Sequence, residues 1–141
     1  MDTHAIAQKA AELLGIKSGD IDIDSAIKRG FSPKEVSHLQ KALNLSDLAL
    51  SRFIGISIKT LQRKRTHCSH LTLQESDRIY RIARIFAQAA IVFGDIAEAR
   101  EWMMDRQYIL GNEIPFILMQ IGVGAKEVEN ALGRIAYGVL V

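Results

Sequence analysis

The chain has 141 residues, of which 48% are hydrophobic and 24% charged, and its formal net charge is +2. This composition is typical of a globular protein and excludes a disordered chain. No apolar run approaches the ~20 residues needed to cross a bilayer, and the single cysteine, Cys68, excludes an intrachain disulfide. The first residues lack the basic and then apolar order of a signal peptide, so we expect a soluble cytoplasmic protein with no membrane partner.

Helical periodicity begins near the start of the chain. Apolar residues recur on one face over 3–14, and a further turn or two of helix is predicted over 25–29. Ser32 with Glu35 three residues later forms a capping box, which predicts a helix over 33–43. We expect these helices to support the segment that follows.

Two short helices joined by a tight turn are predicted over 46–65. Ser46 and Ser57 are suited to cap them, and Gly55 between the two can adopt the left-handed conformation that ends a helix. Their predicted apolar faces are formed by Leu48, Ala49, Phe53, Ile58 and Leu61. This arrangement is that of a helix-turn-helix.

Positive charge is concentrated on this segment. Residues 46–71 contain five basic side chains against the single carboxylate of Asp47, a net charge of +4, whereas the whole chain carries +2. An α-helix fits the major groove, so this pattern predicts DNA binding, although any pair of surface helices also needs a solvated face. The predicted DNA-binding residues are Arg52, Ser57, Lys59, Thr60, Gln62, Arg63, Lys64 and Arg65.

The stretch after the basic helix contains three potential metal ligands, His67, Cys68 and His70. A zinc site needs a second ligand pair at suitable spacing, and none lies nearby, so we interpret the stretch as a connector and predict no metal. Catalysis needs a positioned nucleophile or a general base with an orienting partner, and the sequence offers neither. We therefore predict a protein that is not an enzyme and has no cofactor.

The second half is also predicted to be helical. Thr72 and Glu75 form a capping box that opens the longest helix, 73–93, and later helices are expected after Asp95 and over 125–136. The predicted buried residues are Ile79, Ile82, Ala83, Phe86, Ala90, Phe93, Ala99, Trp102, Met103, Val128, Ala131, Leu132 and Ile135. Gly122 and Gly124 are expected to bracket a tight turn. Alternating strand patterns are absent, so the fold class is all-α.

Dispersed motifs in this half match a known family in order and spacing. They are Val92-Phe93-Gly94-Asp95, Ala99, Trp102, Leu110-Gly111, Ile114-Pro115-Phe116, Gly124-Ala125, Val128 and Leu132 to Val139. Residues 72–141 thereby resemble the toxin-binding domain of Xre/MbcA/ParS-type antitoxins. Residues 1–71 are similar to the Xre-like helix-turn-helix domain of the same proteins, which gives the expected domains 1–71 and 72–141.

The resemblance implies a type II toxin–antitoxin system. The partner toxin would be a RES-domain enzyme that degrades NAD, and the antitoxin would obstruct its NAD pocket with the C-terminal region. The implied toxin-binding residues are Arg134, Tyr137, Gly138, Val139, Leu140 and Val141. The resemblance also implies that the helix-turn-helix binds operator DNA to repress the operon, with the antitoxin as a homodimer within a toxin–antitoxin hetero-oligomer.

Two alternatives remain open at this point. Spacing alone favours a C-terminal tail in which Ile135, Val139 and Val141 fold back onto Trp102 and Phe116 as core, and only the family resemblance favours a toxin contact instead. The whole chain is also consistent with a stand-alone helix-turn-helix transcription regulator whose C-terminal domain serves dimerisation. The first alternative concerns one segment, and the second concerns the function of the entire second half.

Overall fold

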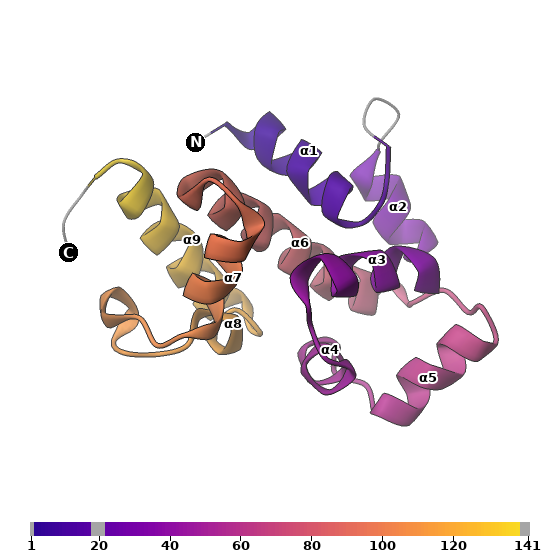
Figure 1. The fold of residues 1–141 in the computed structure, drawn as a ribbon. Helices are drawn as coiled ribbons and strands as arrows, with labels where there is room; N and C mark the ends of the chain where they lie inside the picture. The colour runs from indigo at the N-terminus through magenta and orange to yellow at the C-terminus, as the bar shows by residue number, and fades with distance from the viewer. Residues whose placement is uncertain (1, 18–21, 139–141) are drawn as a thin grey trace. The chain divides into compact units, whose positions relative to one another are not determined.

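The computed structural model describes residues 2–17 and 22–138, and the regular structure of those residues is helical (Figure 1). The elements are α1 (Thr3–Leu13), α2 (Ile23–Arg29), α3 (Pro33–Leu43), α4 (Asp47–Ile54), α5 (Ile58–Thr66), α6 (Leu73–Phe93), α7 (Ile96–Met104), the 3-10 helix η1 (Tyr108–Leu110), α8 (Pro115–Leu118) and α9 (Gly122–Ala136). Within those ranges, β-type pairing is limited to one isolated bridge between Gln107 and Glu113. The predicted all-α class is confirmed.

The helix boundaries follow local capping chemistry. The Ser32 hydroxyl accepts from the Glu35 amide at 3.2 Å while the Glu35 carboxylate accepts from the Ser32 amide at 2.9 Å, which completes the predicted capping box. Thr72 and Glu75 make the same reciprocal pair at the start of α6. These bonds satisfy amide donors that have no partner inside the helix, and so fix where each helix begins.

The chain forms two compact units, and the first comprises residues 8–83. Its core is built from apolar residues of α1, α3, α4, α5 and the first half of α6, and of the segments that directly follow α1 and α2. They include Leu14, Phe31, Leu39, Leu43, Leu50, Ile54, Leu61, Ile79 and Ile82, all at most 1% exposed. Each such side chain contributes about 1.5–3 kcal/mol when it is removed from water, so this unit has a substantial core of its own.

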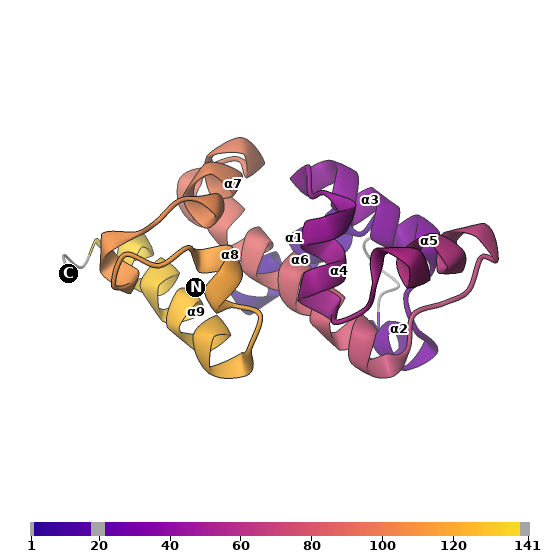
Figure 2. The same ribbon diagram turned by 90° about the horizontal axis from the view of Figure 1, so that it is seen from below.

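The second unit comprises residues 1–7 and 84–141. Here α8 contacts both α7 and α9 (Figure 2). The rings of Phe86 and Phe116 meet edge to face, with centroids 6.2 Å apart. Arg84 of α6 pairs with Glu129 of α9 at 2.6 Å, and residues 85–90 of α6 are buried on every side. The second half of α6 is therefore a core helix of this unit.

The change from one unit to the other falls within α6, between Ala83 and Arg84. The expected functional division at 71/72 lies at the start of this helix, where the Thr72 cap begins it. None of the helices in the described ranges is both long and apolar enough to cross a membrane.

The structure corrects several details of the sequence interpretation. Phe93, Trp102 and Ile135, which were predicted to be buried, are only partly buried. Leu48 does not belong to the apolar face of α4, because it is 46% exposed. The predicted Phe53 does face the core, together with Leu50 and Ile54. The predicted turn at Gly122 and Gly124 is the first turn of α9, which begins three residues before the expected start. Glycine at 124 is required there by packing, because a Cβ would lie 1.9 Å from the carbonyl oxygen of Leu118.

Candidate functional site

The α4–α5 pair has the geometry of a helix-turn-helix. Gly55 ends α4 in the left-handed conformation, with φ 81° and ψ 28°, and its amide donates to the carbonyl of Ser51 at 2.9 Å. Arg78 of α6 donates from Nη1 to the Ile54 carbonyl at 2.8 Å, which satisfies another acceptor at the end of α4. The Ser57 hydroxyl then accepts from the Thr60 amide at 3.0 Å and starts α5. The turn is therefore fixed at both helix ends.

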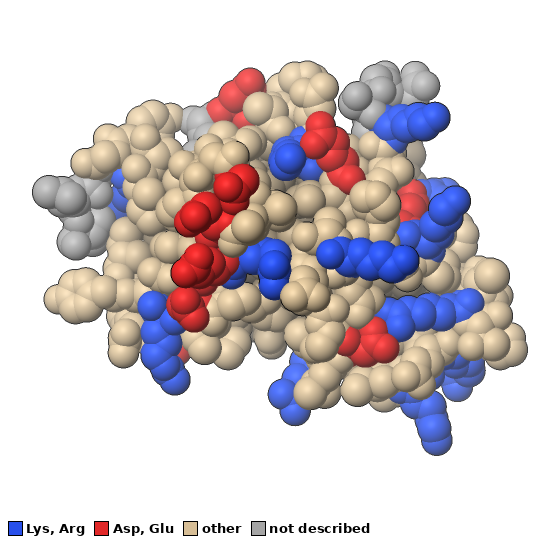
Figure 3. Space-filling model, viewed as in Figure 1, with Lys and Arg blue, Asp and Glu red and all other residues tan. Residues whose placement is uncertain are grey.

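One side of α5 is buried and the other carries polar groups. Leu61 is 1% exposed, whereas Lys59, Gln62 and Arg63 are exposed, as is Arg52 on α4. Lysine and arginine side chains surround α4 and α5 at the lower right of the molecular surface (Figure 3). This surface combines cations, which bind phosphates, with side chains on a helix that can reach base edges.

Four predicted DNA-binding residues also have structural roles: Ser57, Thr60, Lys64 and Arg65. Ser57 is the N-cap of α5, and its hydroxyl donates to Thr60 Oγ1 at 3.0 Å. Lys64 lies 3.4 Å from Glu75 and donates to the His70 carbonyl at 3.3 Å. Arg65 lies 2.9 Å from Asp47. Apart from the capping residue Ser57, the exposed predicted residues are Arg52, Lys59, Gln62 and Arg63, whereas Lys64 and Arg65 are partly buried and face acidic partners of their own chain.

The connector after α5 is tied to the first unit by its main chain and by one histidine. His70 Nδ1 lies 3.0 Å from the Gly30 carbonyl, and the Leu71 amide donates to the Phe31 carbonyl at 3.0 Å. Cys68 is exposed. Across the described ranges, no three histidine, cysteine, aspartate or glutamate side chains are grouped so that they could hold a metal ion. This connector therefore holds the end of α5 against the loop between α2 and α3.

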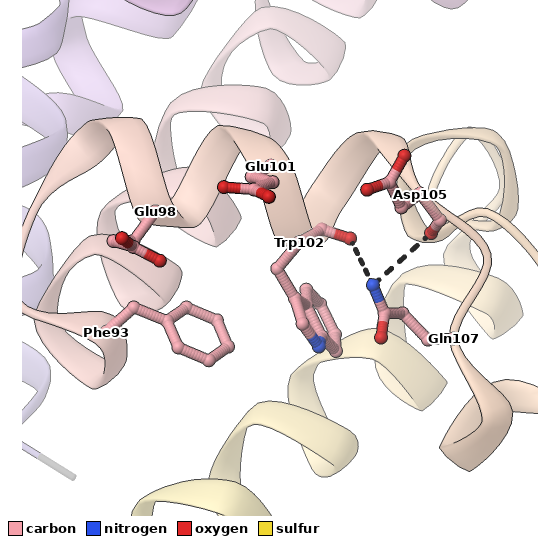
Figure 4. A pocket seen from close by; sticks show the side chains of 6 residues that line it. All are labelled: Phe93, Glu98, Glu101, Trp102, Asp105 and Gln107. Atoms are coloured by element: carbon pink, nitrogen blue, oxygen red, sulfur yellow. Dashed lines mark hydrogen bonds between the residues drawn. The ribbon is translucent and has the colours of Figure 1, made fainter.

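The second unit has a pocket of about 260 Å³ at the end of α6 and along α7 (Figure 4). Its aromatic wall is Phe93 and Trp102, whose ring centroids are 5.6 Å apart, and the Gln107 amide donates to the Trp102 carbonyl at 2.8 Å. The remaining lining residues are the acidic side chains Glu98, Glu101 and Asp105. Carboxylates repel phosphates, so this surface is unsuited to contact with nucleic acid.

The predicted toxin-binding residues lie at the end of α9. Arg134 is exposed, Tyr137 is 71% exposed, and Gly138 follows with φ 69°. Val139, Leu140 and Val141 lie outside the described residues. Tyr137 and Arg134 are three positions apart on one helical turn, so a partner that contacts one of them can reach the other.

Sequence reasoning missed two features of these surfaces. It did not identify the hydrogen bond by which the guanidinium of Arg78, an exposed residue of α6, binds the end of α4. It also did not identify the exposed apolar side chains of Ile117, Ile121 and Val123, which are 57%, 67% and 73% exposed. The continuous apolar run 114–119 was a signal for Ile117, because so short a helix cannot bury every side.

Comparison with known proteins identifies both halves. Residues 22–84 match the antitoxin Xre-like helix-turn-helix domain, and residues 88–138 match the antitoxin Xre/MbcA/ParS C-terminal toxin-binding domain. The first match contains the α4–α5 pair, and the second contains the aromatic pocket, Arg134 and Tyr137. Both domains occur in the order that the sequence resemblance predicted.

Full-length relatives agree with these matches. The chain is 34% identical over 122 residues to the antitoxin Xre of Yersinia enterocolitica, covering 86% of this chain and 82% of that protein. It is 28% identical over 137 residues to the antitoxin Xre of Pseudomonas putida, covering 96% of this chain and 85% of the relative. The antitoxin Xre of Photorhabdus laumondii is 28% identical over 119 residues, with coverage of 84% and 80%.

These similarities favour an antitoxin over a stand-alone regulator, because the second half matches a toxin-binding domain. They also assign the chain to a family of binding proteins that are not enzymes. The chain belongs to the Xre/MbcA/ParS family of antitoxins, with an Xre-like helix-turn-helix domain followed by a toxin-binding domain.

Proposed function

We propose that this antitoxin neutralises a RES-domain toxin that degrades NAD, and that its C-terminal region obstructs the toxin's NAD pocket. The observation that carries the proposal is the position of Tyr137: it ends the last helix of a toxin-binding domain and is 71% exposed. Tyrosine combines a large apolar ring with a hydroxyl, and such side chains dominate the energetics of many interfaces.

Arg134 supports the same contact. Its guanidinium is exposed one turn before Tyr137 and can form two parallel hydrogen bonds with a carboxylate of the toxin. Gly138 lets the chain leave α9 in the left-handed conformation, and the apolar residues 139–141 follow it in sequence. Tyr137 and the three aliphatic residues that follow Gly138 in sequence can enter a pocket that NAD would otherwise occupy.

We propose in addition that α4 and α5 bind operator DNA of the antitoxin's own operon and repress it. The exposed Arg52, Lys59 and Arg63 contact phosphates or base edges, and Gln62 offers both a donor and an acceptor to a base. A homodimer within a hetero-oligomer with the toxin would present two such helices. Two copies related by a twofold axis would read a palindromic operator with one helix in each half-site.

Growth assays test the toxin part of the proposal. Expression of a neighbouring RES-domain reading frame should arrest growth and lower cellular NAD, and co-expression of the antitoxin should restore both. Tyr137→Ala, and deletion of residues 137–141, should abolish the rescue. Tyr108→Ala is the matched control, because Tyr108 is 88% exposed in the same unit but lies outside the predicted contact. If the truncated antitoxin still protects cells, the C-terminal region does not obstruct the toxin.

DNA binding is tested separately. Lys59→Ala together with Arg63→Ala should abolish operator binding and leave rescue from the toxin intact, whereas Lys126→Ala on α9 should change neither. Loss of rescue in the double variant would show that the two halves do not act independently. The wild-type affinity should also fall steeply with salt, because phosphate contacts release counterions.

A further inference from the structure

Three side chains form a closed network between α3, α4 and α5. Arg65 Nη2, near the end of α5, lies 2.9 Å from Asp47 Oδ1 at the start of α4 and also donates to Gln40 Oε1 on α3. Gln40 Nε2 donates to the same Asp47 oxygen at 2.7 Å. Each of the three residues therefore contacts the other two, and each belongs to a different helix.

The network is partly shielded from solvent. The side chains of Arg65 and Asp47 are 29% and 34% exposed. Hydrogen bonds from Arg65 and then from Gln40 keep the pKa of Asp47 below its usual value, so the carboxylate is charged at neutral pH. A guanidinium has several donors in a rigid plane and can bind Gln40 and Asp47 together.

Two contacts of the neighbouring Lys64 also hold the last turn of α5. Lys64, whose side chain is 18% exposed, pairs with Glu75 at 3.4 Å and donates to the His70 carbonyl at 3.3 Å. The two adjacent cations thus fix the end of α5 to different elements of the first unit. Lys59, Gln62 and Arg63 on the same helix are exposed instead.

We propose that Arg65, together with Asp47 and Gln40, is a positioning residue that holds α5 at the angle required for operator binding and is not itself a phosphate contact. The proposal rests on the proposed operator binding by α5. It adds a division of roles within the helix: the exposed cations Lys59 and Arg63 bind DNA, and Lys64 and Arg65 hold the helix in place.

The two roles predict opposite effects for Asp47→Asn. If Arg65 binds a phosphate, removal of the Asp47 charge frees its guanidinium and makes the surface more positive, so DNA affinity rises. If Arg65 positions α5, the same substitution weakens the network and affinity falls, even though the protein has become more positive. Electrostatic attraction alone cannot produce a fall.

The experiment measures binding of the full-length protein to a labelled duplex from directly upstream of its own coding sequence, at several salt concentrations. Asp47→Asn and Arg65→Met should each weaken binding roughly fivefold, and the double variant should be no weaker than either single variant. The slope of log affinity against log salt should stay at the wild-type value. Asp77→Asn, which removes an exposed charge from α6, is the control and should bind as tightly as wild type or more tightly.

Tighter binding by Asp47→Asn, or a salt slope reduced by about one unit in Arg65→Met, would overturn the proposal. Amide hydrogen exchange provides a readout that needs no DNA. Asp47→Asn should accelerate exchange in α5 and leave α9 unchanged, and unaltered exchange in α5 would also overturn it. If the wild-type protein fails to prefer the upstream duplex over a scrambled one, operator binding fails, while the exchange result still decides whether the network holds α5.

Discussion

Arg78 Nη1 donates a hydrogen bond of 2.8 Å to the main-chain carbonyl of Ile54, so a side chain of α6 completes the C-terminal end of α4. The last carbonyls of a helix have no partner within the helix and need one from elsewhere. We expect Arg78→Met to lower the free energy of unfolding by about 1 kcal/mol, measured by urea denaturation. Lys126→Met, at an exposed position of α9, should stay within about 0.5 kcal/mol of wild type. Equal losses in both variants would contradict a specific role for Arg78.

The guanidinium of Arg78 that binds the Ile54 carbonyl also lies next to Gly55. A Cβ at position 55 would lie 2.6 Å from Arg78 Nη1, and the backbone there has φ 81°. Gly55→Ala should therefore cost about 1–2 kcal/mol for the left-handed backbone and about 1 kcal/mol more for the displaced guanidinium. Gly111→Ala is the matched control, because Gly111 has φ 66° but nothing within 4 Å of the added Cβ.

The two substitutions should be non-additive. In the Gly55→Ala background the guanidinium has already left the Ile54 carbonyl, so Arg78→Met should cost close to nothing further. Urea denaturation of the two single variants and the double variant measures the coupling. Additive losses would mean that the added methyl group leaves the hydrogen bond intact.

The close contact at Gly124 predicts a second contrast between glycines. Within α9, a Cβ at 124 would lie 1.9 Å from the backbone carbonyl oxygen of Leu118, whereas a Cβ at 133 meets nothing within 4 Å. Because the obstacle is backbone, Gly124→Ala must displace α8 from α9 and should destabilise the protein by about 1–3 kcal/mol. Gly133→Ala should instead stabilise it by about 0.5–1 kcal/mol, since alanine suits a helix interior better.

Thermal or urea denaturation of both variants, with toxin co-purification as a second readout, checks this prediction. Gly124→Ala should also weaken toxin capture, because α8 and α9 belong to the toxin-binding domain. Gly133→Ala should capture toxin like the wild type. A stable Gly124→Ala variant would show that α8 can move away without cost.

The features that the sequence predicted well are those set by neighbouring residues. Ser32, Ser46, Ser57 and Thr72 each accept a hydrogen bond from an amide three residues later, so the chemistry that begins a helix is visible in a short window. The type and order of the long helices follow from the same windows and from their apolar periodicity.

The features that it missed depend on residues far apart in the chain. Arg65 finds Gln40 across 25 positions, and Arg78 finds Ile54 across 24. The count of charges over 46–71 includes both Arg65 and Asp47, but a count does not show that these two side chains form an ion pair. The turn predicted at Gly124 was wrong for a similar reason: glycine there serves close packing against Leu118 and not a bend in the chain.

The last prediction concerns pH. Hydrogen bonds from Arg65 and Gln40 lower the pKa of Asp47 in the folded protein below 3.8, its ordinary value. A carboxyl group with a lowered folded pKa stabilises the fold above its unfolded pKa, and that contribution is lost as pH falls through the folded pKa. The difference in free energy of unfolding between wild type and Asp47→Asn should therefore be greatest near neutral pH and shrink below about pH 3.8. The difference should stay under about 1 kcal/mol, because the pair is about one-third exposed and solvent screens it.

Urea denaturation of wild type and Asp47→Asn at several pH values measures this difference. In an Arg65→Met background, the same Asp47→Asn substitution should show a much weaker pH dependence. An undiminished pH dependence in that background would mean that Asp47 draws its stabilisation from another partner.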